Sequence, residues 1–172
     1  MADPIVQNQY TFNHQIIKKS DPSQTEAYDC TYSPYLKHRD GTGGKSQWRD
    51  VVTKDVEFRL FKNALQNEWV RLESFKYKKK KYHRLQSPNG RGWGLYVVNG
   101  KLEELGVLEN WEIHVRVCIF EEGNAKLWHG YPADLTKPQD KPLDHVLQKW
   151  RSAKFINKAT MNKIKGGRIK SL

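Results

Sequence analysis

The densest group of chemically capable side chains lies in residues 128–134 (WHGYPAD). His129 titrates near neutral pH, and a carboxylate such as Asp134 can orient an imidazole, which is the pairing used in general acid–base catalysis. One histidine and one carboxylate define no reaction, and aromatic residues followed by a proline are also typical of a packed strand end. We therefore interpret this segment as the exit of a strand and assign it no catalytic residue.

Other segments of the sequence exclude a nucleotide cofactor and a metal. Residues 41–46 (GTGGKS) look like a nucleotide-binding loop, but the position that needs its first glycine is Arg39, and no buried strand precedes it. The two cysteines are 88 residues apart and lack any zinc-ligand spacing, so we expect free thiols. Three carboxylates are the remaining candidates for metal ligands: Asp134, Asp140 and Asp144. They are six and four residues apart in a proline-rich loop, a spacing that does not predict a cluster around a metal ion.

The positive charge of the chain is concentrated in two stretches. Residues 76–91 hold seven Lys/Arg and no acid, and residues 149–172 hold eight Lys/Arg and no acid. The rest of the chain carries 15 basic residues against 19 acids, so the formal net charge of +11 comes from these two stretches. Segregated positive charge attracts polyanions through Coulomb forces and counterion release, which makes phosphate backbones the natural partner class.

The first basic stretch also carries aromatic rings, which can stack on bases beside the phosphate contacts. The other interpretation is an edge strand kept from aggregating by its lysines, although four consecutive lysines exceed that need. Tyr82, His83 and Arg84 could serve a metal-free nuclease, but alternate residues of a strand point to opposite faces and separate the histidine from the other two. The predicted contacts are seven basic residues for phosphates and two rings for stacking: Lys76, Lys78, Lys79, Lys80, Lys81, Arg84 and Arg91, with Tyr82 and Trp93.

The second basic stretch is predicted to be helical. Leu143, Val146, Leu147 and Trp150 form one apolar stripe, and a shorter helix over 158–165 follows, with Asn157 as its N-cap and glycines as its stop. The pair is partly similar to a helix-turn-helix, but the second helix offers side chains suited to phosphates rather than to base edges. A packing helix with a basic end is the other interpretation. The predicted phosphate contacts are Lys158, Lys163, Lys165, Arg168 and Lys170.

The elements around these segments predict a single α+β domain over residues 1–172. We expect an irregular arm over 1–50, a central antiparallel sheet over 51–132, a helical pair over 142–166 and a basic tail over 167–172. The sheet region would hold a strand and then a helix or turn over 51–67, a long strand over 68–85 and a hairpin turn at 87–90. A strand over 93–98 would end in a turn at Asn99-Gly100, and another strand would follow over 111–120. A four-residue loop would connect the last strand to another over 125–131.

These features together predict a nucleic-acid-binding protein rather than an enzyme, with RNA or single strands favoured over duplex DNA. It would act alone or as an accessory of a larger protein or ribonucleoprotein complex. Two alternatives stay open: a small, toxin-like ribonuclease that needs no metal, and a basic accessory protein that docks on an acidic protein. The sequence shows no signal-peptide pattern and no apolar run of membrane-spanning length, so we expect a cytoplasmic protein with no membrane partner and no cofactor.

Overall fold

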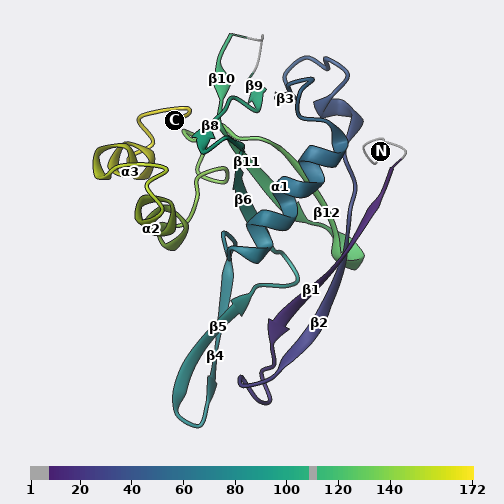
Figure 1. Ribbon diagram of the computed structural model, residues 1–172, viewed down its shortest axis with the longest axis vertical. Helices are drawn as coiled ribbons and strands as arrows, with labels where there is room; N and C mark the ends of the chain where they lie inside the picture. Colours follow the sequence, from purple (N-terminus) through teal and green to yellow (C-terminus); the bar gives the residue numbers. More distant parts are fainter. Residues whose placement is uncertain (1–7, 109–111) are drawn as a thin grey trace.

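The computed structural model describes residues 8–108 and 112–172 and shows an α+β fold built on a mixed five-stranded sheet (Figure 1). The strand order is β1-β2-β12-β11-β6, in which β12 and β2 run parallel and the other neighbours antiparallel. The predicted fold class is therefore confirmed. The strands are β1 (Tyr10–Ile17), β2 (Thr25–Tyr32), β6 (Arg91–Leu95), β11 (Val117–Glu122) and β12 (Leu127–Pro132).

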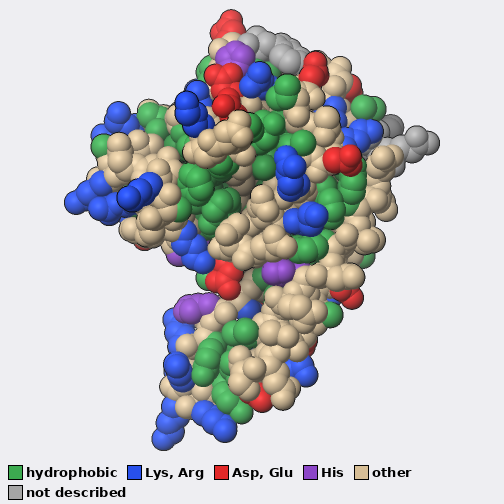
Figure 2. Space-filling model, in the orientation of Figure 1, with side chains coloured by type: hydrophobic (Ala, Val, Ile, Leu, Met, Phe, Trp, Pro, Cys, Tyr) green, Lys and Arg blue, Asp and Glu red, His purple; other side chains and the backbone are tan. Residues whose placement is uncertain are grey.

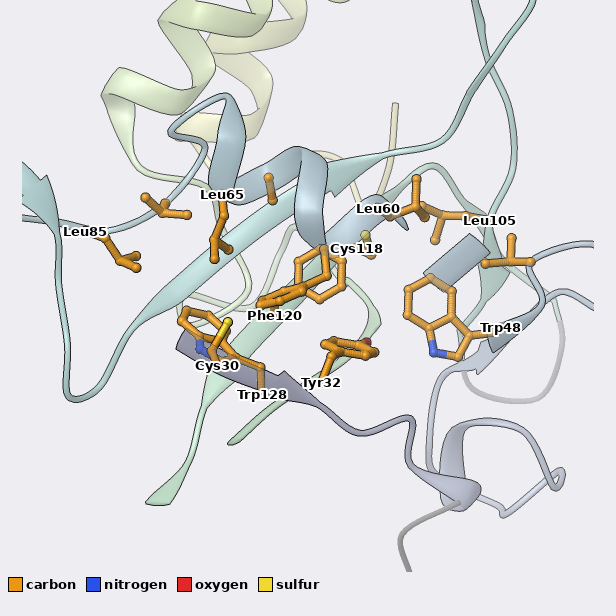
Figure 3. Packing of buried hydrophobic residues seen from close by; sticks show 14 of the residues in the cluster. Cys30, Tyr32, Trp48, Leu60, Leu65, Leu85, Leu105, Cys118, Phe120 and Trp128 are labelled. Carbon is orange, nitrogen blue, oxygen red and sulfur yellow. The ribbon is translucent and has the colours of Figure 1, made fainter. Parts of the chain in front are cut away.

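Both faces of this sheet are covered, each by its own hydrophobic cluster. Along β11, Cys118 and Phe120 point to the face covered by α1 (Lys54–Gln66), where Trp128 and Tyr32 also pack (Figure 3). The alternate residues Val117 and Ile119 point to the opposite face, which is covered by α2 (Asp144–Ser152) and α3 (Lys158–Lys165). Because alternate strand residues serve two cores, the first four residues of β11 are all apolar and buried.

Helix α1 replaces the strand that the alternation of Val56, Phe58 and Leu60 predicts. Its N-cap is Thr53, whose side chain accepts a hydrogen bond from the Val56 amide at 3.3 Å. The acidic residues of the first turn, Asp55 and Glu57, stabilise the helix because their negative charges lie at the positive end of its dipole. The helical spacing of buried side chains such as Phe61 and Leu65 therefore extends over all of residues 54–66, and the predicted strand is wrong.

The predicted irregular arm over residues 1–50 is also wrong over much of its length, because β1 and β2 form a long antiparallel hairpin. Its half-buried side chains alternate along β1, and Tyr28, Cys30 and Tyr32 are buried along β2. The Asp21 carboxylate accepts hydrogen bonds from the Ser23 amide and hydroxyl in the turn. The chain continues through the 3-10 helix η1 (Leu36–His38) to the short strand β3 (Gln47–Trp48).

The predicted long strand over 68–85 folds back on itself. It forms the hairpin of β4 (Leu72–Tyr77) and β5 (Lys80–Leu85), with its turn at Lys78 and Lys79. The predicted hairpin turn at 87–90 instead connects β5 to β6, which lie in different sheets. The hairpin of β4 and β5 projects from the body of the molecule (Figure 1).

Small strands complete the upper part of the fold. Asn99 and Gly100 adopt positive φ in the turn between β7 (Val97–Val98) and β8 (Lys101–Leu102), as the sequence predicts. The expected strand over 111–120 is split at Arg116, since β10 (His114–Val115) pairs with β9 (Gly106–Val107) in a separate sheet, while Trp111 lies outside the described residues. A four-residue loop does precede β12, but it spans 123–126 instead of the predicted 121–124, because Glu121 and Glu122 still pair within the sheet. This loop contains the 3-10 helix η3 (Asn124–Lys126).

The C-terminal helical pair agrees closely with the prediction. Val146, Leu147 and Trp150 of α2 are fully buried, whereas Leu143 of the predicted stripe is the N-cap residue and is 37% exposed. The Asn157 side chain caps α3 by accepting a hydrogen bond from the Thr160 amide at 2.8 Å. Both cysteines are free and buried, as expected. Within the part of the chain that the structure describes, no helix combines the length and apolar character that crossing a membrane requires.

Candidate functional site

The first basic stretch forms the projecting hairpin of β4 and β5, which we call the lysine hairpin (residues 72–85). Lys78 and Lys79 occupy its turn with φ of 48° and 66°, a left-handed backbone conformation that residues other than glycine rarely adopt. All five predicted lysines, at positions 76 and 78–81, are exposed. The sequence prediction placed these charges on one strand, whereas the turn gathers them at the end of a ribbon.

The lysines of this hairpin lack acidic partners. Lys76 lies directly opposite Lys81 in the register, and like charges in that position destabilise a strand pair. Among residues 8–108 and 112–172, no carboxylate lies within ion-pair distance of any of the five lysines. The folded protein therefore concentrates positive charge here without ion pairs among the described residues, and Figure 2 shows Lys and Arg side chains around the lower projection. At longer range, the hydrogen bonds from Ser23 and, to a smaller extent, the Lys78 charge lower the pKa of Asp21.

Aromatic side chains line one face of the lysine hairpin. Phe75 stacks against Tyr82 across the strands with ring centroids 5.7 Å apart, and Tyr77 is next along the same face. The Lys78 and Lys80 ammonium groups lie 5.3 Å and 5.5 Å from the centroids of the Tyr77 and Tyr82 rings. The rings are half-buried, so part of each remains at the surface beside the positive charge.

Arg84 anchors the hairpin and is not one of its free charges. Its guanidinium contacts Glu73 at 2.9 Å, Glu26 at 2.8 Å and the Ile17 carbonyl at 3.1 Å. These contacts connect the base of the lysine hairpin to the end of the β1–β2 hairpin. The prediction that Arg84 contacts phosphate therefore conflicts with its arrangement, because its charge is already shared between two carboxylates.

Two further predicted contacts lie away from the hairpin, on β6. Trp93 is 1% exposed and its indole N–H donates to the Asp140 carbonyl at 2.9 Å, so its ring is not accessible to a base and the stacking prediction is corrected. Arg91 donates to the Gln139 carbonyl at 2.8 Å and lies 3.4 Å from a Glu121 carboxylate oxygen. Trp93 belongs to the hydrophobic cluster beneath α2 and α3, and Arg91 lies at the polar end of the same strand, so neither residue is part of the lysine surface.

The second basic stretch is partly neutralised. Lys165 pairs with Asp144 at 2.6 Å, and the Lys170 ammonium lies 4.0 Å from Asp134. The other predicted contacts, Lys158, Lys163 and Arg168, are exposed on or just after α3. In Figure 1 the helical pair and the lysine hairpin are separate projections, so the two basic stretches do not merge into one patch on the viewed face.

A cleft of about 680 Å³ opens beside the polar end of the main sheet, on the face that α2 and α3 cover elsewhere. A row of ionisable side chains crosses the sheet there: Arg91 of β6 pairs in register with Glu121 of β11, which pairs with His129 of β12. The His129 Nε2 atom lies 3.6 Å from a Glu121 oxygen. The Tyr35 ring stacks on the imidazole at 4.2 Å with an interplanar angle of 2°.

A second row lies next to the first. The Tyr131 hydroxyl is 3.0 Å from one oxygen of Glu121 and 3.4 Å from one of Asp140, and the His38 ring packs on the Tyr131 ring at 5.1 Å. Burial, with the nearby Glu121 and Asp140 charges, raises the pKa of Tyr131, so the phenol stays neutral. Burial also raises the pKa of Asp140 and lowers that of His38 to about 4. We call this group the histidine cleft (His38, Glu121, His129, Tyr131, Asp140).

Comparison with known proteins gives no family for this chain. No known family model, curated protein or solved structure matches it. The candidate sites therefore depend on the geometry of the molecule itself.

The loop that carries His38 is fixed by buried polar contacts. Its neighbour Arg39 forms a 2.5 Å contact with Glu57 of α1, whose side chain is fully buried and also accepts a 2.5 Å hydrogen bond from the Tyr32 hydroxyl. The Gln47 amide donates to the Lys37 carbonyl at 2.7 Å and accepts from the Gly41 amide at 3.0 Å. The glycine-rich segment that looks like a nucleotide loop is thus a surface loop closed by Gln47.

The sequence reasoning identified His129 but not the groups that surround it. It paired the histidine with Asp134, whose carboxylate instead accepts hydrogen bonds from the Thr136 amide and hydroxyl. If the hairpin loop had been placed at 123–126, the pairing of the two strands would have put Glu121 opposite His129. No feature of the sequence around His38 indicates that it lies beside this site. Within the described parts of the chain, no group of three or more potential metal ligands is placed to hold an ion.

Proposed function

We propose that this protein binds nucleic acid through the phosphate backbone, with the lysine hairpin as its main contact surface. The observation that carries this proposal is the gathering of five exposed lysines at the end of a projecting ribbon, with Lys76 directly opposite Lys81 and no carboxylate partner among the described residues. An external polyanion would relieve this repulsion and release its own counterions.

The rings favour RNA or single strands over duplex DNA. Stacking on an aromatic side chain stabilises one unpaired base by about 1 to 3 kcal/mol, whereas an exposed cation–π contact contributes about 0.5 to 1 kcal/mol. A base would therefore displace the Lys80 ammonium from the Tyr82 ring, and the displaced lysine would remain close enough to contact the adjacent phosphate. Bases in a duplex are already stacked and gain nothing from such a surface.

The exposed basic residues of α3 and the tail form a second, weaker phosphate surface in this proposal. Lys158, Lys163 and Arg168 contribute to it, while the ion pairs of Lys165 and Lys170 reduce their share. Docking on a larger ribonucleoprotein complex in the cytoplasm is part of the same proposal. An acidic protein is the alternative partner for both surfaces.

Titration of labelled RNA at several salt concentrations tests the proposal. Single-stranded RNA, single-stranded DNA and duplex of equal length are compared, and the expected order of affinity places the single strands first. Each phosphate contact on a single strand contributes about −0.7 to the slope of log affinity against log salt concentration. No binding at low salt, or a slope near zero, contradicts the proposal.

A matched pair of variants then locates the surface. Replacing Lys78–Lys81 by Gln, four residues together, should weaken RNA binding for all sequences and flatten the salt slope by about 2 to 3, at about 0.7 per contact. The control removes the same charge elsewhere, by Gln at Lys54, Lys62, Lys101 and Lys126, and should keep most of the slope. Equal losses in both variants would show that net charge, not the hairpin, determines binding.

A further inference from the structure

The histidine cleft contains acid–base groups that the proposed binding does not use. Beyond the part of the sheet covered by α2 and α3, the same face presents ionisable side chains where a core would continue with apolar ones. Two histidines, a tyrosine and two carboxylates from separate segments converge on one open cleft. Structural packing alone does not require so many titratable groups, and such convergence is typical of catalytic sites.

His129 is placed to accept a proton. The Tyr35 ring stacks on its imidazole, and the Glu121 carboxylate lies 3.6 Å from Nε2. A carboxylate at this distance stabilises the imidazolium formed when a proton is taken up. The side chain is 18% exposed, so a substrate in the cleft can reach the ring.

Tyr131 is placed to donate a proton. Its hydroxyl lies 3.0 Å from the second oxygen of the same Glu121, so one carboxylate connects the proton acceptor with the donor. Burial keeps the phenol in its neutral form. The His38 Nδ1 atom lies 2.8 Å from the Ser46 carbonyl, which only accepts, so Nδ1 carries the proton and the ring is a fixed support for Tyr131.

Among the described residues that line the cleft, four lysines stand beside four carboxylates. The buried carboxylates are occupied within the protein: Asp134 accepts from Thr136, and Asp140 accepts from the Asp134 amide at 3.0 Å. Lys45 is exposed at the rim, and Lys170 lies there too, with its ammonium 4.0 Å from the Asp134 carboxylate. A phosphodiester could therefore lie with its charge toward the rim and its sugar toward His129.

We propose that the histidine cleft cleaves RNA by transfer of the phosphate to the 2′-oxygen. His129 takes the proton of the 2′-hydroxyl, the 2′-oxygen bonds to the adjacent phosphorus, and the bond from phosphorus to the 5′-oxygen breaks. Tyr131 gives its proton to the leaving 5′-oxygen, and the proton on His129 returns to the phenolate through Glu121. The products are a 2′,3′-cyclic phosphate and a 5′-hydroxyl, with no change in oxidation state and no water consumed.

The lysines of the rim stabilise the charge that builds on the phosphorane-like transition state, and the reaction needs only groups of the protein and the RNA. His38 is a positioning residue, because it packs on Tyr131 and acts through it. The choice of RNA as substrate depends on the proposed nucleic-acid binding, whereas the acid–base geometry of the cleft does not. This division allows the two proposals to fail separately.

The test incubates the full chain with end-labelled single-stranded RNA in the presence of a chelator, and with DNA of the same sequence. Shortened RNA ending in 2′,3′-cyclic phosphate, with intact DNA, is the expected result. His129→Ala and Tyr131→Phe should each lower the cleavage rate about 100-fold or more, since one general acid or base contributes a factor of that size. His114→Ala, at an exposed histidine of β10, is the control and should keep the activity.

Two further measurements keep the test decisive. Added imidazole should restore part of the activity of His129→Ala, which a merely unfolded variant would not show. RNA that binds the protein but stays intact at stoichiometric concentration would overturn the cleavage proposal and leave the binding proposal standing. Cleavage that survives in both cleft variants, or that acts equally on DNA, would also overturn it, while failure of RNA to bind at any salt concentration would remove both.

Discussion

The lysine hairpin and the histidine cleft differ in how their charges are partnered. In the hairpin, Lys76 faces Lys81, and no carboxylate of the described residues lies within ion-pair distance of the five lysines. In the cleft, Glu121 is shared by Arg91, His129 and Tyr131. Unpartnered charge attracts an external ligand but fixes no geometry, whereas a shared carboxylate holds side chains in one arrangement. The first kind of site suits binding, and the second suits chemistry.

The two sites also differ in how the chain builds them. The lysine hairpin is one continuous stretch whose pairing is local, and its contacts to the body are concentrated at its base, where Arg84 reaches Glu26 and Ile17. The histidine cleft joins the loop after β2, strands β11 and β12 and the loop before α2. Damage to the body of the fold should therefore disturb the cleft much more than the hairpin.

The largest effect is expected from Glu57→Ala. Removing this fully buried carboxylate leaves Arg39 without its partner and the Tyr32 hydroxyl without its acceptor, which costs about 3 to 5 kcal/mol of unfolding free energy. Urea denaturation measures the loss. The loop that carries His38 should loosen, so RNA cleavage should fall further than RNA binding does when both are measured on the folded variant.

The control for this variant is Asp55→Ala on the same helix turn. Asp55 is exposed and accepts a hydrogen bond from the Tyr10 hydroxyl at 2.6 Å, so its loss should cost about 1 kcal/mol or less. A similar stability for the two variants would show that the buried pair contributes little and would remove the contrast between the two regions.

The next effect is a pH dependence of stability that comes from His38. Burial, with smaller contributions from Lys37, His129 and Lys45, lowers its folded pKa to about 4, against the opposing hydrogen bond to Ser46. The unfolded state then binds more protons below the ordinary value near 6.5, so unfolding free energy falls as pH drops from about 6.5 toward 4, by about 2 to 3 kcal/mol.

Comparison with His38→Gln isolates this contribution from other groups. The raised pKa values of Glu57 and Asp140 act in the opposite direction at the acidic end, but they are present in both proteins and cancel in the difference. Denaturation curves at several pH values provide the measurement. A difference between the two proteins that does not change with pH would contradict the assignment of a neutral, buried His38.

The sequence predicts the parts of the fold whose signals are local. The apolar stripe of α2, the Asn157 cap of α3 and the Asn99-Gly100 turn each lie within a few residues and are confirmed. The lysine turn is missed because lysines at positive φ carry no turn signature. The β1–β2 hairpin is missed because its alternating residues include polar ones such as His14, which lies half-buried between Phe12 and Ile16.

The histidine cleft was beyond sequence reasoning for a different reason. His129 and Glu121 become neighbours only when the register of β11 and β12 is known, since a shift by one residue would send either side chain to the opposite core. His38 joins them through the Arg39–Glu57 contact, which spans 18 residues and ends on a helix predicted in part as a strand. The lysine hairpin needed no such information, because its charge density is visible in the sequence itself.

The smallest expected effect is the most specific test of the lysine hairpin. In Lys81→Glu the new carboxylate faces Lys76 directly, so a repulsive cross-strand pair becomes attractive and unfolding free energy should rise by about 0.2 to 1 kcal/mol. RNA affinity should fall at the same time, because a phosphate contact is replaced by a repulsion. The melting temperature and the RNA affinity of this one variant would thus change in opposite directions.

Lys101→Glu, on the exposed strand β8, makes the same charge change and should alter neither quantity by a comparable amount. If Lys81→Glu weakened both stability and binding, the lysines would contribute to the fold of the hairpin. The lysine hairpin would then not be a surface that only presents charge, and its contrast with the histidine cleft would be lost.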